Sequence, residues 1–167
     1  RAFYHDPDVY RAEIDQIWRS GWIFVAHDCE IPTPGDYLTI EIDDESLLVC
    51  RDDSGRINAF YNVCRHRGTR LCEETAGHMG RIVCPYHQWT YDRSGKLCSA
   101  RGMDADLNFD EWALLPVSVT TAAGMIYISL AENPPTFEKV GKRISEAAAP
   151  QGFESAKVAC AIDYEIE

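Results

Sequence analysis

Cys64-Arg65-His66 and, after 17 intervening residues, Cys84-Pro85-Tyr86-His87 dictate the architecture of this chain. Each stretch supplies one thiol and one imidazole. Such side chains suit a two-iron cluster in which two cysteines hold one iron and two histidines hold the other. They also suit a tetrahedral zinc site with two cysteines and two histidines, so the residue types alone leave both metal centres open.

The order of the ligands separates these alternatives. Zinc modules usually pair like with like, as Cys-x-x-Cys followed by a second pair of histidines. Here each stretch is mixed, so two mixed loops must face each other across the metal. A cluster of the Rieske type needs that arrangement, because both cysteines must reach one iron and both histidines the other. The sequence therefore favours a Rieske cluster with the ligands Cys64, His66, Cys84 and His87.

The composition is typical of a folded protein of one domain. The chain has 167 residues, of which 46% are hydrophobic and 11% aromatic. Its net charge of −11 and its pI near 4.8 disfavour nucleic acid and anionic membranes as partners. No apolar run approaches the ~20 residues of a membrane span. We therefore predict a cytoplasmic protein that binds neither nucleic acid nor a membrane.

Seven cysteines are present, and five of them lie outside the ligand stretches. A cytosolic chain keeps its thiols reduced, and a free thiol in an apolar segment behaves as a small hydrophobic group. We predict that these five are buried thiols rather than disulfides: Cys29, Cys50, Cys72, Cys98 and Cys160.

The beginning of the chain is predicted to be helical. Asp6 has the character of an N-cap, and Pro7 suits the first helical position. An apolar stripe follows at helical spacing, and we expect it to pack against the rest of the protein. The stripe consists of Tyr10, Ile14, Ile17 and Trp18.

From residue 22 onward, short β-rich runs alternate with turns, as at 32–36 and 52–55. Strands are predicted at 22–26, 37–42, 47–51, 57–62, 81–84, 89–92, 117–121 and 125–130. A helix over 136–149 and a last strand over 157–166 follow. This order predicts a mainly β protein, an antiparallel sandwich or partly open barrel with flanking N-terminal and C-terminal helices. Both ligand stretches follow strands and should lie on surface loops.

At these motifs the chain resembles the N-terminal Rieske [2Fe-2S] domain of the α subunit of Rieske non-haem iron oxygenases, the ring-hydroxylating dioxygenase superfamily. Segments 64–68 and 84–92 carry the resemblance, and 22–25 and 34–37 match too. The run 62–72 looks most like the group that demethylates quaternary amines such as glycine betaine, stachydrine or carnitine. The resemblance implies lead-in elements over 1–40, the cluster domain over 41–130, and a helix and strand over 131–167 that lead to a catalytic domain.

The resemblance also implies a role for each ligand. Cys64 and Cys84 would hold the iron that stays ferric, and His66 and His87 would hold the iron that accepts the electron. Relatives in respiratory complexes carry an extra cysteine in each loop and a serine near a bridging sulfide. This chain has Thr69, Tyr86 and Trp89 at those places. With fewer hydrogen bonds to sulfur, its potential should lie toward the low end of the ~−150 to +300 mV Rieske range.

In such oxygenases the cluster takes electrons from a flavin-dependent reductase or a ferredoxin. It passes them to a mononuclear non-haem iron in a neighbouring α subunit of a homotrimer, where O2 is activated for N-demethylation or hydroxylation. The chain has no histidine after His87, so that iron would belong to an absent catalytic domain. We expect no oxygenase activity from this chain alone. The alternatives are a freestanding Rieske ferredoxin and a zinc-binding module.

Several neighbours of the ligands are candidates for secondary roles. Arg65, Arg67 and Arg70 could tune the cluster or dock a partner, but the sequence favours ion pairs between them and nearby acids. Tyr86 and Trp89 are expected to shield the cluster from water.

Overall fold

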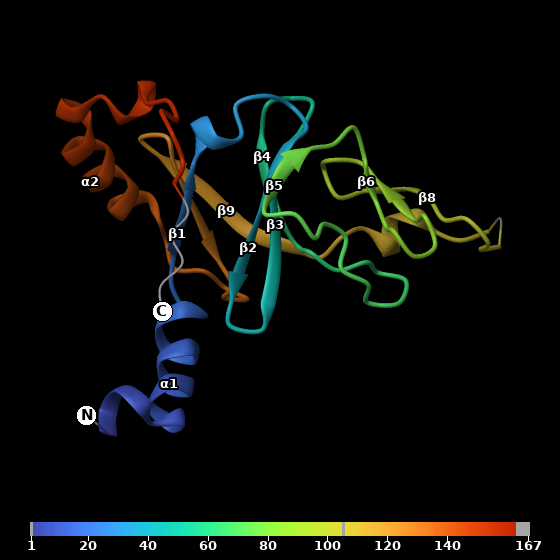
Figure 1. Ribbon diagram of the computed structural model, residues 1–167, viewed down its shortest axis with the longest axis horizontal. Helices are drawn as coiled ribbons and strands as arrows, with labels where there is room; N and C mark the ends of the chain where they lie inside the picture. Colours follow the sequence, from blue (N-terminus) through green and yellow to red (C-terminus); the bar gives the residue numbers. More distant parts are fainter. Residues whose placement is uncertain (1, 105, 163–167) are drawn as a thin grey trace.

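The computed structural model describes residues 2–104 and 106–162, and Figure 1 shows their arrangement. Ten strands form two antiparallel sheets, a seven-stranded one in the order β1-β10-β9-β4-β3-β2-β5 and a three-stranded one in the order β6-β7-β8. The mainly β prediction with flanking helices is confirmed. The strands are Ile23–His27 (β1), Asp36–Ile42 (β2), Glu45–Arg51 (β3), Ile57–Tyr61 (β4), Ala76–His78 (β5), Ile82–Val83 (β6), Thr90–Tyr91 (β7), Leu97–Ser99 (β8), Pro116–Ala122 (β9) and Met125–Ser129 (β10).

The first helix begins as predicted. The Asp6 carboxylate accepts a hydrogen bond of 2.9 Å from the Asp8 amide, and Pro7 opens α1, Pro7–Glu13. The helix continues as a wider turn over Ile14–Trp18. In the described parts of the chain, no helix is long and apolar enough to cross a membrane.

The predicted packing of the apolar stripe is wrong for most of its members. Ile14 is buried, but Tyr10, Ile17 and Trp18 are each more than two-fifths exposed. Figure 1 shows why, since α1 projects away from the sheets instead of lying across one. The segment is held to the β2–β3 turn by polar contacts: the Tyr10 hydroxyl donates to Asp43, and Arg19 pairs with Asp44 at 2.7 Å.

Strand β3 lies in the middle of the protein and is buried on both of its faces. Leu47 and Val49 point into one apolar cluster, and Leu48 and Cys50 point into another. Successive side chains of a strand point to opposite faces of the sheet. A continuous apolar run in a strand therefore indicates that both faces of the strand are covered. The second cluster also contains the candidate ligands Cys64 and Cys84. The predicted metal site is therefore built onto one of the two cores.

The end of the described chain differs in part from the prediction. The helix α2, Glu138–Ala148, confirms the predicted C-terminal helix. Residues 157–162 are exposed and form no strand, which is a correction to the predicted strand over 157–166; residues 163–166 lie outside the described part. The five cysteines outside the ligand stretches are free thiols, as predicted. Cys50 is buried and Cys29 and Cys72 are half-buried, but Cys98 and Cys160 are exposed rather than buried.

Two turns of similar sequence fix the sheets to each other. In the turn after β3, Asp52 accepts hydrogen bonds from the Ser54 amide, the Ser54 hydroxyl and the Arg56 amide at 2.6–3.0 Å. In the turn after β7, Asp92 accepts the equivalent three bonds, two of them from Ser94. Both turns are therefore closed by an aspartate at the first position, which explains the repeated Asp-x-Ser-Gly pattern.

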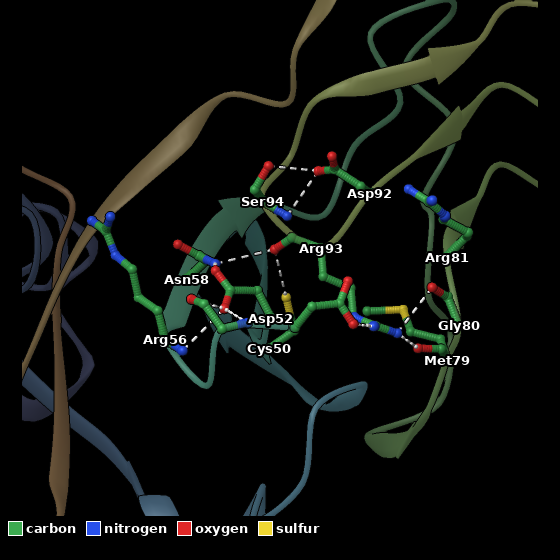
Figure 2. Close-up of polar contacts among 12 residues, drawn as sticks. Cys50, Asp52, Arg56, Asn58, Met79, Gly80, Arg81, Asp92, Arg93 and Ser94 are labelled. Carbon is green, nitrogen blue, oxygen red and sulfur yellow. Dashed lines mark hydrogen bonds and ion pairs between the residues drawn. The ribbon is translucent and has the colours of Figure 1, made fainter.

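Arg93 joins the second turn to its surroundings, as Figure 2 shows. Its guanidinium donates to the Met79 and Gly80 carbonyls at 2.9 Å and pairs with Asp53 of the first turn. Its own carbonyl accepts a bond of 3.1 Å from Asn58 on β4. The short strands β6 and β7 are thereby fastened to the large sheet. That support matters because such short strands have little stability of their own.

The first turn generates a stability prediction. Replacing Asp52 with alanine leaves its three donor residues, Ser54, Arg56 and Asn58, without their acceptor. We expect the free energy of unfolding to fall by about 1–3 kcal/mol, measured by urea denaturation near neutral pH. Asp110→Ala is the matched control. It breaks only an exposed pair with Lys96 at 3.2 Å and should cost no more than ~0.5 kcal/mol.

The effect should also depend on pH. Partial burial by itself raises the pKa of Asp52, but the hydrogen bonds outweigh it and hold the pKa below its ordinary value of 3.8. A carboxylate of this kind stabilises the fold above its ordinary pKa, and the stabilisation is lost as the pH falls through the lowered pKa. The difference between Asp52→Ala and the unchanged chain should therefore shrink below about pH 4. A difference that stays constant into acid would contradict this account.

Candidate metal centre

The first ligand loop, which follows β4, is closed by two backbone hydrogen bonds. The Cys64 amide donates to the Thr69 carbonyl at 2.8 Å, and the Gly68 amide donates to the Cys64 carbonyl at 3.0 Å. Gly68 has a φ of 71°, in the left-handed region that glycine enters without steric cost. The chain therefore turns back on itself within six residues, 64–69, and presents His66 at the tip.

The second loop, which follows β6, is closed in the same way. The Cys84 amide donates to the Trp89 carbonyl at 2.8 Å, and the Gln88 amide donates to the Cys84 carbonyl at 3.0 Å. Gln88 occupies the position of Gly68 and has a φ of 61°, which is unusual for a residue with a side chain. Its side-chain oxygen accepts a bond of 2.9 Å from Arg101. The strained position thus retains a side chain that makes a specific contact.

The two loops bring the four predicted ligands together in two layers. Cys64 and Cys84 are buried, with exposures of 2% and 1%. The His66 and His87 rings are half-buried, their centroids lie 4.7 Å apart, and their planes are inclined at 70°. The thiols are therefore set in the core and the imidazoles at the surface, as the predicted division between two irons requires.

Each of the two candidate histidine ligands has a buried nitrogen atom without a partner. The Nδ1 atoms of His66 and His87 are inaccessible to solvent and form no hydrogen bond to any residue that the structure describes. A buried polar atom without a partner costs roughly 1–3 kcal/mol. Coordination of a metal by both Nδ1 atoms would remove that cost, so the residues present fit a cluster of the Rieske type.

The zinc alternative gains no support from the ligand geometry. A structural zinc ion needs four ligands, all within about 2.3 Å of one atom. Over residues 2–104 and 106–162, no group of three or more His, Cys, Asp or Glu side chains is arranged to hold a single metal ion. A two-iron centre spreads its ligands over two metals and does not need such a group.

Burial controls the electrostatics of the centre. It raises the pKa of the Cys64 thiol, and the nearby Cys84 adds to that effect, whereas hydrogen bonds from Tyr91 and the His66 amide oppose it. Burial also lowers the pKa of His66, with smaller contributions from the charges of His87 and Arg67. Without metal, the protein therefore disfavours the thiolate form of Cys64 and the imidazolium form of His66. A cation that binds both thiolates supplies the missing compensation.

Aromatic side chains surround the ligands. Trp89 is fully buried and stacks on the His66 ring at a centroid distance of 4.8 Å, so it covers one face of that ring. The centroid of the Tyr86 ring lies 3.7 Å from that of the His87 ring, so Tyr86 covers one face of the imidazole. Tyr86 itself is 60% exposed and therefore does not close the site to solvent.

The Tyr91 hydroxyl was not predicted to take part. It lies 3.5 Å from the Cys64 sulfur and accepts a bond of 3.2 Å from the Arg65 amide. Tyr91 belongs to β7 and is 27 residues from Cys64, so no local pattern links the two. The three arginines of the first loop also differ from the prediction. Arg70 pairs with Glu41 at 2.9 Å, but in the described residues Arg65 and Arg67 form no ion pair.

Comparison with known proteins agrees with this centre. The family described as Rieske [2Fe-2S] domain matches residues 21–119. The glycine betaine monooxygenase oxygenase subunit of Chromohalobacter salexigens is 45% identical over 161 residues, which cover 95% of this chain and 36% of that protein. The benzene 1,2-dioxygenase subunit alpha of Pseudomonas putida is 35% identical over 133 residues, which cover 78% of this chain and 30% of that protein.

Solved structures show the same likeness. A crystal structure of the quaternary ammonium Rieske monooxygenase CntA with L-carnitine has a TM-score of 0.80 and 32% identity, and the match covers 90% of this chain and 45% of that one. The chain thus spans about a third of the curated relative that it matches at 45% identity, and less than half of the solved one. It belongs to the Rieske [2Fe-2S] domain family and corresponds to the Rieske part of the oxygenase subunits of monooxygenases and ring-hydroxylating dioxygenases.

Proposed function

We propose that Cys64 and Cys84 hold one iron and His66 and His87 the other, and that this chain carries electrons to the mononuclear iron of an oxygenase. The buried Nδ1 atoms of His66 and His87 support this proposal best, because neither has a hydrogen-bond partner among the described residues and metal coordination would supply one. The cluster supplies reversible uptake of one electron. The protein holds the thiols away from water and keeps the imidazole pair near the surface, where an electron can enter and leave.

The relatives support a proposal for the substrate class. The glycine betaine monooxygenase subunit is 45% identical to this chain, and the carnitine monooxygenase subunits are 33–36% identical. The names of these proteins, and that of CntA, indicate that they act on quaternary ammonium compounds. We infer that the complete enzyme demethylates or hydroxylates such a compound. A flavin-dependent reductase or a ferredoxin would supply the electrons, and a neighbouring α subunit of a trimer would receive them. A freestanding ferredoxin is disfavoured, because these relatives are oxygenase subunits.

The cluster itself is tested by spectroscopy. We expect protein purified without oxygen to be red-brown, to contain about two irons and two acid-labile sulfides, and to give a Rieske-type EPR signal after reduction with dithionite. Zinc without sulfide, or an EPR signal of the all-cysteine type, would rule out the proposed function.

The ligand assignment is tested by substitution. Cys84→Ser and His87→Asn should each lower the cluster content at least about tenfold, because each removes a direct ligand. Cys98→Ser and His78→Asn are matched controls. Cys98 is an exposed free thiol and His78 an exposed partner of Asp36, so both controls should keep the full content. Equal loss in variants and controls would show that folding, rather than ligation, has been disturbed.

The Tyr91 hydroxyl should tune the reduction potential. A hydrogen bond to a sulfur ligand favours the more negative, reduced state, so removal of the hydroxyl should lower the potential. Tyr91→Phe should lower it by roughly 20–60 mV, the equivalent of about 0.5–1.5 kcal/mol for one electron, measured by redox titration followed by EPR. Tyr127→Phe removes the same atom from a half-buried ring on β10 and should leave the potential unchanged. No shift in Tyr91→Phe would contradict the assigned role.

A further inference from the structure

Buried nitrogen atoms without a partner gather around the two ligand loops. In the part of the chain that the structure describes, seven side-chain nitrogens are inaccessible to solvent and form no hydrogen bond. Four of these atoms belong to the loops: Arg65 Nε, His66 Nδ1, His87 Nδ1 and Trp89 Nε1. Buried polar groups are normally paired, so such a concentration marks a place where a further group is needed.

The four atoms do not all need the same partner. An unprotonated imidazole nitrogen carries a lone pair and can bind a metal. The Nε1 atom of Trp89 carries a hydrogen and is a donor only, so it needs an acceptor and no metal can satisfy it. Arg65 has further donor atoms on a side chain that is only half-buried. Trp89 has this single polar side-chain atom, and the residue is fully buried.

The indole of Trp89 is held in place by contacts on its ring and on its backbone. Its ring stacks on His66 at a centroid distance of 4.8 Å with 6° between the planes. The ring of Trp112 lies at 5.4 Å and is inclined at 80°. The Trp89 carbonyl accepts the bond of 2.8 Å from the Cys84 amide that closes the second loop. The donor is therefore fixed within the core that also contains Cys64 and Cys84.

The described chain contains no oxygen, nitrogen or sulfur atom that accepts from Trp89 Nε1. A buried indole N–H usually has such a partner. The ring of Trp112 is nearly perpendicular to that of Trp89, but an aromatic face is a weak acceptor and does not replace an atom with a lone pair. The donor therefore fits a bound group that brings acceptor atoms of its own.

We propose that the indole N–H of Trp89 donates a hydrogen bond to a sulfur atom of the iron-sulfur cluster and thereby raises the reduction potential. The inference rests on the proposed function, because it needs a cluster held by the four ligands. When Nδ1 of His66 is a ligand, Trp89 stacks on a ring that is bound to the cluster, whose sulfur atoms are acceptors. Reduction adds negative charge, so the hydrogen bond is stronger in the reduced state. The indole keeps its proton throughout.

On this account each side of the centre has its own donor. The Tyr91 hydroxyl lies 3.5 Å from the Cys64 sulfur, and Trp89 stacks on His66. Position 89 is one of the places at which the sequence predicted that a donor to sulfur is lacking. An indole N–H at this place means that the potential lies above the value expected from that lack.

The test exchanges a single group. Incorporation of benzothienylalanine at position 89 puts sulfur in place of the N–H and keeps the shape of the ring. In redox titrations followed by EPR, we expect the ratio of reduced to oxidised cluster at a fixed potential to fall about threefold to tenfold. This corresponds to a potential lower by about 28–59 mV, at 59 mV per tenfold change for one electron. The same exchange at position 112, whose ring packs on Trp89, is the matched control and should leave the ratio unchanged.

Two further measurements test the hydrogen bond itself. With isotopically labelled indole nitrogen, the reduced cluster should show a weak hyperfine coupling to that nitrogen and to an exchangeable proton. Both couplings should disappear after the exchange at position 89 and remain after the exchange at position 112. The fall in potential should be the same at about pH 6 and about pH 8, because the indole N–H does not titrate, whereas an effect through the imidazoles would change with pH.

The outcomes separate this inference from the proposed function. A chain that binds no iron-sulfur cluster contradicts both. A cluster with a Rieske-type EPR signal, whose potential ignores the exchange at position 89, overturns the role of Trp89 alone. Equal shifts at positions 89 and 112 also overturn it, because the effect would then come from the packing of the two rings and not from the N–H.

Discussion

Two loops of different sequence are closed by the same pair of backbone hydrogen bonds, and the candidate metal centre depends on that closure. In each loop the cysteine amide donates to the carbonyl five residues later, and the residue before that carbonyl is left-handed. The closure fixes the thiol at the base of the loop, in the core, and the histidine at its tip. Insertion of one residue would break the hydrogen bonds and move the imidazole away from its counterpart.

The loops in turn depend on how the small sheet is attached. Strands β6 and β7 have two residues each, so most of their stability comes from the shared core and from Arg93. Trp89 and Tyr91 are fully buried in that core and lie just after the second loop. The residues that contact the candidate ligands His66 and Cys64 are therefore the same ones that hold the small sheet in place.

The features that sequence predicted are those encoded within a few neighbouring residues. The Cys-x-His and Cys-x-x-His pairs, the Asp6 cap and the turn at 52–55 are local, and the structure contains each of them. Six of the seven strands of the large sheet were predicted, because their apolar runs are long. Strand β5 was missed, since Ala76-Gly77-His78 carries no periodic pattern and becomes a strand only by pairing with β2. Strand β8 was missed as well, and it too exists through its pairing with a neighbour, β7.

Other features could not be predicted because they join distant residues. The contact of Tyr91 with Cys64 and that of Arg101 with Gln88 both depend on how separate loops meet. The stripe of α1 was recognised correctly as apolar, but periodicity does not say what covers a helix face, and most of this stripe is exposed. The apolar residues of 157–162 suggested a strand, yet a strand needs a neighbour, and none pairs with this segment within the described chain.

Because the thiols are more deeply buried than the imidazoles, the two sides of the centre differ in their exposure to reagents from the solvent. Chelators, oxygen and peroxide arrive from the solvent, so they reach the half-buried rings of His66 and His87 before the enclosed sulfur atoms. In a centre held by these four side chains, loss of metal would therefore begin on the imidazole side. The two thiols, which are enclosed in the core, would be the last part of the centre that these reagents reach.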